Sequence, residues 1–82
     1  MSKNQRIRVA QWGLGAMGQG VAKVILAKEG LELVGAFDIS PDLVGKDVGE
    51  VLGVAPAGVK VSNDPASILD PEKVDVVTIA TT

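Results

Sequence analysis

Three glycines, Gly13, Gly15 and Gly18, have the spacing G-x-G-x-x-G, and their pattern is the one in this sequence that best suits a chemical task. A turn built from such glycines can bring backbone N–H groups against a phosphate, because no Cβ obstructs the approach. We assign Gly13 to the tight turn, Gly15 to the close approach of the phosphate, and Gly18 to close packing of the following helix. Structural turns use the same spacing, so the flanking elements must decide between the two interpretations.

Those flanking elements have the required periodicity. Residues 7–12 form a short β-branched run typical of a strand. From about residue 17 to 28 apolar residues recur at helical spacing, and Gly30 predicts the end of this helix. The start of this helix would offer unpaired N–H groups and the positive end of the helix dipole to an anion. The predicted apolar face of the helix contains Met17, Val21, Val24 and Ile25, with Gly18 and Ala22 nearby, although Met17 could instead face the pyrophosphate turn. The predicted pyrophosphate turn consists of Gly13, Leu14, Gly15, Ala16, Met17 and Gly18.

An acidic residue, Asp38, stands twenty positions beyond Gly18, directly after a second predicted strand at 31–37. At this place a carboxylate accepts hydrogen bonds from the adenosine ribose hydroxyls and repels a 2′-phosphate, which favours NAD. Ser40 could donate a hydrogen bond to such a phosphate, and Lys46 could swing towards it, although an exposed lysine is the simpler interpretation. The sequence therefore predicts NAD or NADP as the cofactor, with Asp38 and Ser40 at the ribose.

The remainder of the chain continues the alternation of strands and helices. We expect a loop with at most a short helix near 47–52, a strand at 59–62, a brief helix capped by Asn63 or Asp64, and a fourth strand at 74–82. This order predicts an α/β fold, a partial Rossmann-like parallel sheet of about four strands in the order 3-2-1-4. Ligands of such sheets bind beyond the carboxyl ends of the strands. The predicted contacts at the end of the last strand are Ala80, Thr81 and Thr82, although the two threonines could equally be polar residues that only end the strand.

Composition limits the classes of function. The chain has 82 residues, a net charge of −2 and dispersed cations, so nucleic acid and anionic membranes are poor partners. It has no cysteine and no histidine, which excludes thiolate chemistry and the usual metal ligand. We predict no metal site and name no catalytic residue.

The first ten residues have no secretory pattern and no apolar run spans a bilayer, so we expect a cytoplasmic protein. Trp12 is interpreted as a packing residue rather than a cofactor contact.

The stretches "IRVAQWGLGAMGQGVAKVIL" and "ELVGAFDISPDLVGKDVGEVLG" resemble the N-terminal cofactor domain of the 2,4-diaminopentanoate dehydrogenase family, which includes native amine dehydrogenases. The sequence is more distantly similar to dihydrodipicolinate reductase, but Ala16 stands where that family's "GRMG" turn has an arginine. The resemblance implies an NAD(P)-dependent oxidoreductase that interconverts an amine and a ketone. It also implies that the small-molecule substrate binds to a following domain.

We expect residues 1–82 to be the N-terminal portion of a dinucleotide-binding domain, with the substrate domain missing. The last predicted strand is almost continuously apolar, which is typical of a strand with neighbouring strands and with helices packed on both faces. Its exposure would favour self-association of the full-length protein as a homo-oligomer. A natural stand-alone small domain is the alternative. For function, the alternatives are a dihydrodipicolinate reductase-like enzyme, a dinucleotide-sensing module without catalysis, and a structural fragment with an empty turn.

Overall fold

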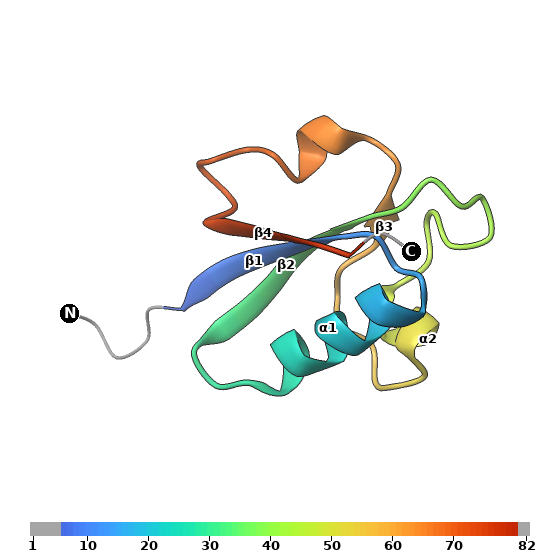
Figure 1. The fold of residues 1–82 in the computed structure, drawn as a ribbon, viewed down its shortest axis with the longest axis horizontal. Coiled ribbons are helices and arrows are strands. Elements are labelled where there is room, and N and C mark those ends of the chain that lie inside the picture. The colour runs from blue at the N-terminus through green and yellow to red at the C-terminus, as the bar shows by residue number, and fades with distance from the viewer. Residues whose placement is uncertain (1–5, 81–82) are drawn as a thin grey trace.

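The computed structural model describes residues 6–80, which contain one parallel sheet in the strand order β3-β2-β1-β4 (Figure 1). The strands are β1 (Ile7–Trp12), β2 (Leu31–Phe37), β3 (Val61–Ser62) and β4 (Val76–Ile79). The helices are α1 (Ala16–Ala27), α2 (Val48–Leu52) and the 3₁₀-helix η1 (Pro65–Ser67). The predicted partial Rossmann-like fold and its strand order are confirmed.

The two faces of the sheet are covered by different segments. Helices α1 and α2 lie on one side, and the segment that contains η1 lies on the other (Figure 1). Alternation along the strands divides the core accordingly, because successive side chains point to opposite faces. The helix side contains Val9, Leu14, Ala22, Ile25, Leu33, Ala36, Val48, Leu52 and Val61. The opposite side contains Ala10, Phe37, Ile68 and Val74, with Trp12 packed against them.

The buried face of α1 differs from the predicted one. Gly18, Ala22 and Ile25 are buried, whereas Met17 and Val24 are 62% and 59% exposed. The reason is the close contact between the helix and the turn that precedes it. A Cβ on Gly18 would lie 1.9 Å from the carbonyl oxygen of Gly13, so Gly18 must face the turn, and this orients the whole helix. Placing Val24 on the core face was therefore wrong, and of the two positions considered for Met17 the core face is excluded.

The last two strands are shorter than predicted. Val59 and Lys60 precede β3 rather than belonging to it, because their backbone pairs with residues 46–48: Val48 N donates to Val59 O, and Lys60 bridges to Asp47. Val74 lies outside β4, because its N–H closes a turn onto the carbonyl of Asp70. The short strands still end at the same edge of the sheet as β1 and β2.

Two aspartates cap the short helices, and Asp64 is one of the two caps predicted for η1. Asp47 caps α2, and its carboxylate accepts hydrogen bonds from the N–H groups of Gly49, Ala57 and Gly58. These bonds favour the charged form and lower the pKa of Asp47 below its ordinary value, with the bond from Ala57 as the largest cause. Asp64 caps η1 by accepting from Ala66 N. None of the helices within residues 6–80 has the length and hydrophobicity that a bilayer crossing requires.

Candidate functional site

The turn after β1 requires glycine at its first position. Gly13 has a φ of 101°, in the left-handed region that side chains disfavour. A Cβ there would also lie 2.2 Å from the carbonyl oxygen of Ala80, at the end of β4. The turn is bonded to the neighbouring strand, because Gly13 N donates to Phe37 O over 2.8 Å. The tight turn predicted for Gly13 therefore has a direct physical cause.

The other two glycines of the turn have different reasons to lack a side chain. Gly18 packs against the Gly13 carbonyl, so its close contact is with the turn and with the Gln11 amide on β1. Gly15 has φ −69° and ψ −171°, an extended conformation that any residue adopts. Conformation therefore does not demand glycine at this position, which lines the pocket at the start of α1.

The N-terminus of α1 is suited to an anion. Gly15 is its N-cap residue and makes no side-chain capping bond, and the first turn contains no acidic residue. The first N–H groups of a helix have no partner within the helix, and they carry the positive end of its dipole, roughly half a charge. A phosphate supplies both the missing acceptor and the opposite charge. Ala16 and Met17, in this first turn, are exposed and leave the approach open.

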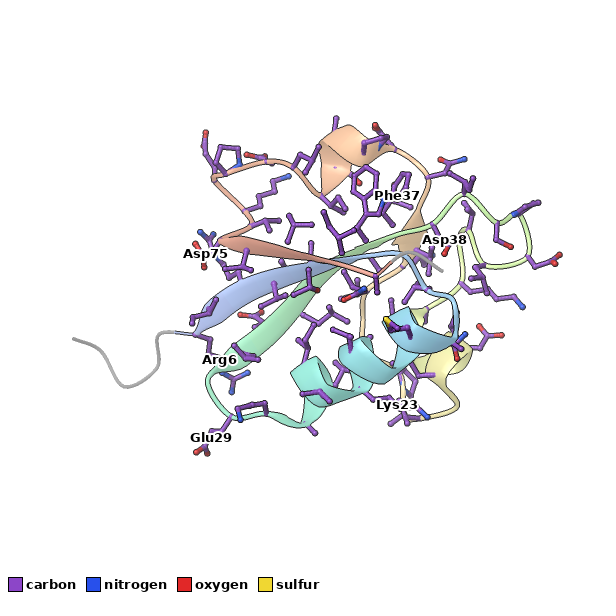
Figure 2. The ribbon with its side chains drawn as sticks, viewed as in Figure 1. Arg6, Lys23, Glu29, Phe37, Asp38 and Asp75 are labelled. Atoms are coloured by element: carbon purple, nitrogen blue, oxygen red, sulfur yellow. The ribbon has the colours of Figure 1, made fainter. Side chains whose placement is uncertain are left out.

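Asp38 follows β2 and binds the turn directly. Its Oδ2 accepts a hydrogen bond from Leu14 N over 2.8 Å, and its Oδ1 accepts one from Ser40 N over 2.8 Å. Each carboxylate oxygen can accept a second hydrogen bond, so the group retains acceptors for hydroxyl donors. Figure 2 shows Asp38 at the end of the sheet beside the turn, and Asp75 at the opposite end. The Asp38 carboxylate therefore joins the glycine turn to the loop after β2.

A pocket of about 660 Å³ opens at this end of the sheet. Its volume is within the range of small-molecule and cofactor sites, about 300–1,000 Å³. Trp12 and Phe37 stack on one wall with ring centroids 4.1 Å apart. The pocket is lined by Trp12, Gly13, Leu14, Gly15, Phe37, Asp38, Ile39, Ser40, Leu43 and Ala80. Glycine backbone, aromatic walls and one carboxylate thus surround a single cavity.

The structure brings together most of the predicted site residues. Six of them line the pocket: Gly13, Leu14, Gly15, Asp38, Ser40 and Ala80. Leu14 contributes backbone, because its side chain is 1% exposed and lies in the core. Ala16, Met17 and Gly18 belong to the first turn of α1 beside the pocket. The predictions for Thr81 and Thr82 fall outside the described residues.

Several lining residues were not predicted as part of the site. Phe37, Ile39 and Leu43 contribute apolar walls, and Trp12, interpreted as packing, both packs and lines the pocket. Their signal in the sequence was position, since Trp12 and Phe37 end β1 and β2, and Ile39 and Leu43 lie in the loop after β2. Ile39 is 77% exposed, which is unusual for an isoleucine and is explained by its place at the pocket. Lys46 is exposed and does not line the pocket.

These features define a class of protein: a Rossmann-like domain with a glycine turn, an open helix start and an acidic residue at one end of its sheet, the arrangement typical of dinucleotide-binding domains. Residues 7–81 match the family described as "Dihydrodipicolinate reductase, N-terminus", and the chain belongs to that family. This membership confirms the predicted cofactor class, NAD or NADP. It also agrees with the resemblance found in the motifs around Gly13 and Asp38.

Three known proteins are similar to this chain. The 4-hydroxy-tetrahydrodipicolinate reductase of Synechocystis sp. is 44% identical over 61 residues, which are 74% of this chain and 22% of the reductase. The solved structure of an amine dehydrogenase from Mycobacterium smegmatis superposes with a TM-score of 0.85 at 40% identity, covering 96% of this chain and 23% of that one. The redox-sensing transcriptional repressor Rex of Staphylococcus epidermidis is 30% identical over 82 residues, 99% of this chain and 36% of the repressor. The chain therefore spans less than a quarter of the length of the two enzymes.

Proposed function

We propose that this chain is the cofactor-binding part of an NAD(P)-dependent oxidoreductase that interconverts an amine with a ketone and ammonia. The single observation that carries the cofactor site is the uncapped start of α1, which opens beside the glycine turn into the pocket that Asp38 borders. The site fits the cofactor, since the pocket of about 660 Å³ is bordered by the N-cap residue of α1, Gly15, and by the Asp38 carboxylate. The relatives support an oxidoreductase, because a reductase and a dehydrogenase are among them.

In this proposal the chain binds and orients the cofactor. The N–H groups at the start of α1 bind the pyrophosphate, and Asp38 accepts hydrogen bonds from the ribose hydroxyls. Trp12, Phe37 and Leu43 exclude water from the adjoining wall. The bound nicotinamide supplies the hydride that is exchanged with the substrate carbon. Thr81 and Thr82 remain predicted contacts along the cofactor.

Asp38 supports a preference for NAD over NADP. Its carboxylate would lie beside the 2′ position of the ribose and repel a phosphate there. Two backbone N–H groups hold the carboxylate in place, so it cannot turn away without losing both hydrogen bonds. Lys46, the cation that the sequence offered as a phosphate partner, does not line the pocket.

The amine substrate is supported by the turn and by the breadth of the structural match. Ala16 occupies the place of the arginine in the "GRMG" turn of dihydrodipicolinate reductases. The amine dehydrogenase superposes on 96% of the chain at 40% identity. The reductase remains the second candidate, because the family match and the 44% identity favour it specifically.

The 82-residue chain alone is expected to bind the cofactor and to turn nothing over. Amine–ketone interconversion needs a proton donor and acceptor beside the reacting carbon, in addition to the hydride. The sequence has no histidine and no tyrosine to serve as this group. The proton relay and the substrate pocket would come from a further domain of a longer protein that contains this chain. Amine-dependent reduction of NAD by the chain alone would contradict this view.

The test has two stages. Separate titrations of the chain with NADH and NADPH, followed by cofactor fluorescence, should show binding with a preference for NADH. A longer protein that contains the chain is then assayed for amine-dependent reduction of NAD. It is also assayed for reductase activity on 4-hydroxy-tetrahydrodipicolinate. Reductase activity alone would replace the amine assignment by the second candidate. Binding in the first stage without either activity would favour a nucleotide-sensing module, a possibility raised by the Rex relative.

A further inference from the structure

Gln11 is the one buried polar side chain in the part of the chain that the structure describes, with 0% of it exposed. It lies in β1 on the same face as Val9, between the sheet and α1, and it pairs in register with Thr78 of β4. A buried amide costs about 1–3 kcal/mol unless its hydrogen bonds are made. An apolar residue would fill this place without that requirement, so the bonds that Gln11 makes need an explanation.

The hydrogen bonds fix the orientation of the Gln11 amide. Its Nε2 donates to the carbonyl oxygen of Gly13 over 3.1 Å and more weakly to that of Trp12 over 3.4 Å. Its Oε1 accepts from the Thr78 hydroxyl over 2.5 Å. Carbonyl oxygens only accept, so the NH₂ group must face Gly13 and Trp12. The Oε1 atom then faces Thr78, whose hydroxyl donates to it and anchors this end of the amide.

The Gly13–Leu14 peptide group is held from both sides. In a planar trans peptide the C=O and the N–H point in opposite directions. Gln11 donates to the C=O of this group, and Asp38 accepts from its N–H over 2.8 Å. The next carbonyl, that of Leu14, accepts from Gln19 Nε2 over 3.0 Å. Side chains from β1, the end of β2 and α1 thus fix the backbone of the glycine turn.

We propose that Gln11, oriented by Thr78, is a positioning residue that fixes the Gly13–Leu14 peptide group and thereby the shape of the turn that meets the pyrophosphate. This inference rests on the proposed function, since it takes the cofactor to bind at the turn. A reversed peptide would bring the Gly13 oxygen towards the Asp38 carboxylate, which places two acceptors together with no proton between them. It would also remove the carbonyl against which Gly18 packs.

The first test compares Thr78→Val with Thr78→Ser, because valine removes the hydroxyl donor at similar size and serine keeps it. We expect Thr78→Val and Gln11→Met to weaken the binding of ADP-ribose by about 3–10-fold, the effect of one lost hydrogen bond. Thr78→Ser should bind within about twofold of the unaltered chain. Adenosine, which has no pyrophosphate, should bind all four proteins alike. Equal losses for adenosine would show general damage to the pocket and would overturn the positioning role.

The second test needs no ligand. The backbone amide of Leu14 is followed by ¹H–¹⁵N NMR in the full chain, where its bond to Asp38 should slow hydrogen exchange. We expect faster exchange and a shifted resonance in Thr78→Val and Gln11→Met, and restoration in Thr78→Ser. In the Gln11→Met/Thr78→Val double variant, the Leu14 amide should exchange no faster than in Gln11→Met alone, because Thr78 acts through Gln11.

The two proposals fail in different ways. If the unaltered chain binds neither NADH nor ADP-ribose, the proposed function is wrong, and the Leu14 amide still decides whether Gln11 and Thr78 fix the peptide. If the chain binds both ligands, and Thr78→Val neither weakens ADP-ribose nor changes the Leu14 amide, the inference from Gln11 is overturned and the proposed function stands.

Discussion

The Asp38 carboxylate and the Leu14 backbone amide are 2.8 Å apart, although 24 positions separate them in the sequence. This hydrogen bond connects the end of β2 to the glycine turn after β1. One residue thereby shapes the turn and, in the proposed function, also binds the ribose. Substitutions at Asp38 should consequently affect the affinity for the cofactor and the choice between NAD and NADP together.

Replacing Asp38 by asparagine tests this double role. Asparagine keeps one acceptor but turns an NH₂ group towards one of the two N–H donors, so one of the bonds to Leu14 or Ser40 is lost. We expect NADH to bind about tenfold more weakly, since hydrogen bonds to charged groups contribute about 1.5–3 kcal/mol. The ratio of NADPH to NADH affinity should rise, because the repulsion of the 2′-phosphate is removed. Fluorescence titrations with both cofactors measure this ratio, and an unchanged ratio would contradict the assignment of Asp38 to the ribose.

Two glycines of α1 provide a matched pair for stability. A Cβ on Gly18 would lie 1.9 Å from the Gly13 carbonyl oxygen, whereas a Cβ on Gly20 would meet nothing within 4 Å. Gly18→Ala should lower the free energy of unfolding by ~1–3 kcal/mol through overpacking. Gly20→Ala should raise it by ~0.5–1 kcal/mol, because alanine is the better helix former. Urea unfolding followed by circular dichroism measures both, and equal signs would contradict the packing of Gly18.

The ion pair between Arg8 and Asp75 predicts a dependence of stability on pH. The guanidinium of Arg8 donates to both carboxylate oxygens of Asp75, over 3.1 Å to Oδ2 and 2.9 Å to Oδ1, and this lowers the pKa of Asp75 from 3.8 to about 2. Because the folded pKa lies below the unfolded one, the stabilisation is fully present above about pH 4 and is lost as the pH falls through 2.

Asp75→Asn removes this titration. The unaltered chain should be the more stable of the two at neutral pH, and the difference in the free energy of unfolding should shrink as the pH falls from 4 to 2. Urea unfolding of both proteins across this range is the measurement. A difference that stays constant with pH would show that the pair with Arg8 does not shift the titration of Asp75.

Trp12 should report the occupancy of the pocket. It is the single tryptophan of the chain, it stacks on Phe37, and it lines the cavity. We expect NADH to quench its emission, because the reduced nicotinamide ring absorbs the light that tryptophan emits. ADP-ribose, which lacks this ring, should quench less at equal occupancy. Trp12→Phe supplies the blank, and unchanged tryptophan emission at saturating NADH would place the cofactor away from this pocket.

The sequence predicted those features whose causes are local. The change of period at Gly13, the glycine spacing and the acidic residue after residues 31–37 sufficed for the strand order and for most of the pocket. The rotation of α1 could not be predicted, because it depends on the contact of Gly18 with the preceding turn rather than on the apolar pattern. The bond between Gln11 and Thr78 spans 67 positions and follows from the pairing of β1 with β4, which leaves no local pattern.

The end of β1 is bonded to both neighbours at the pocket. Gly13 N donates to Phe37 O over 2.8 Å, and Ala80 N donates to Trp12 O over 3.0 Å. The pocket can therefore widen at this point only if β1 separates from both β2 and β4. Deuterium should enter these two amides at the slow pace of global unfolding, and not at the pace of a surface loop.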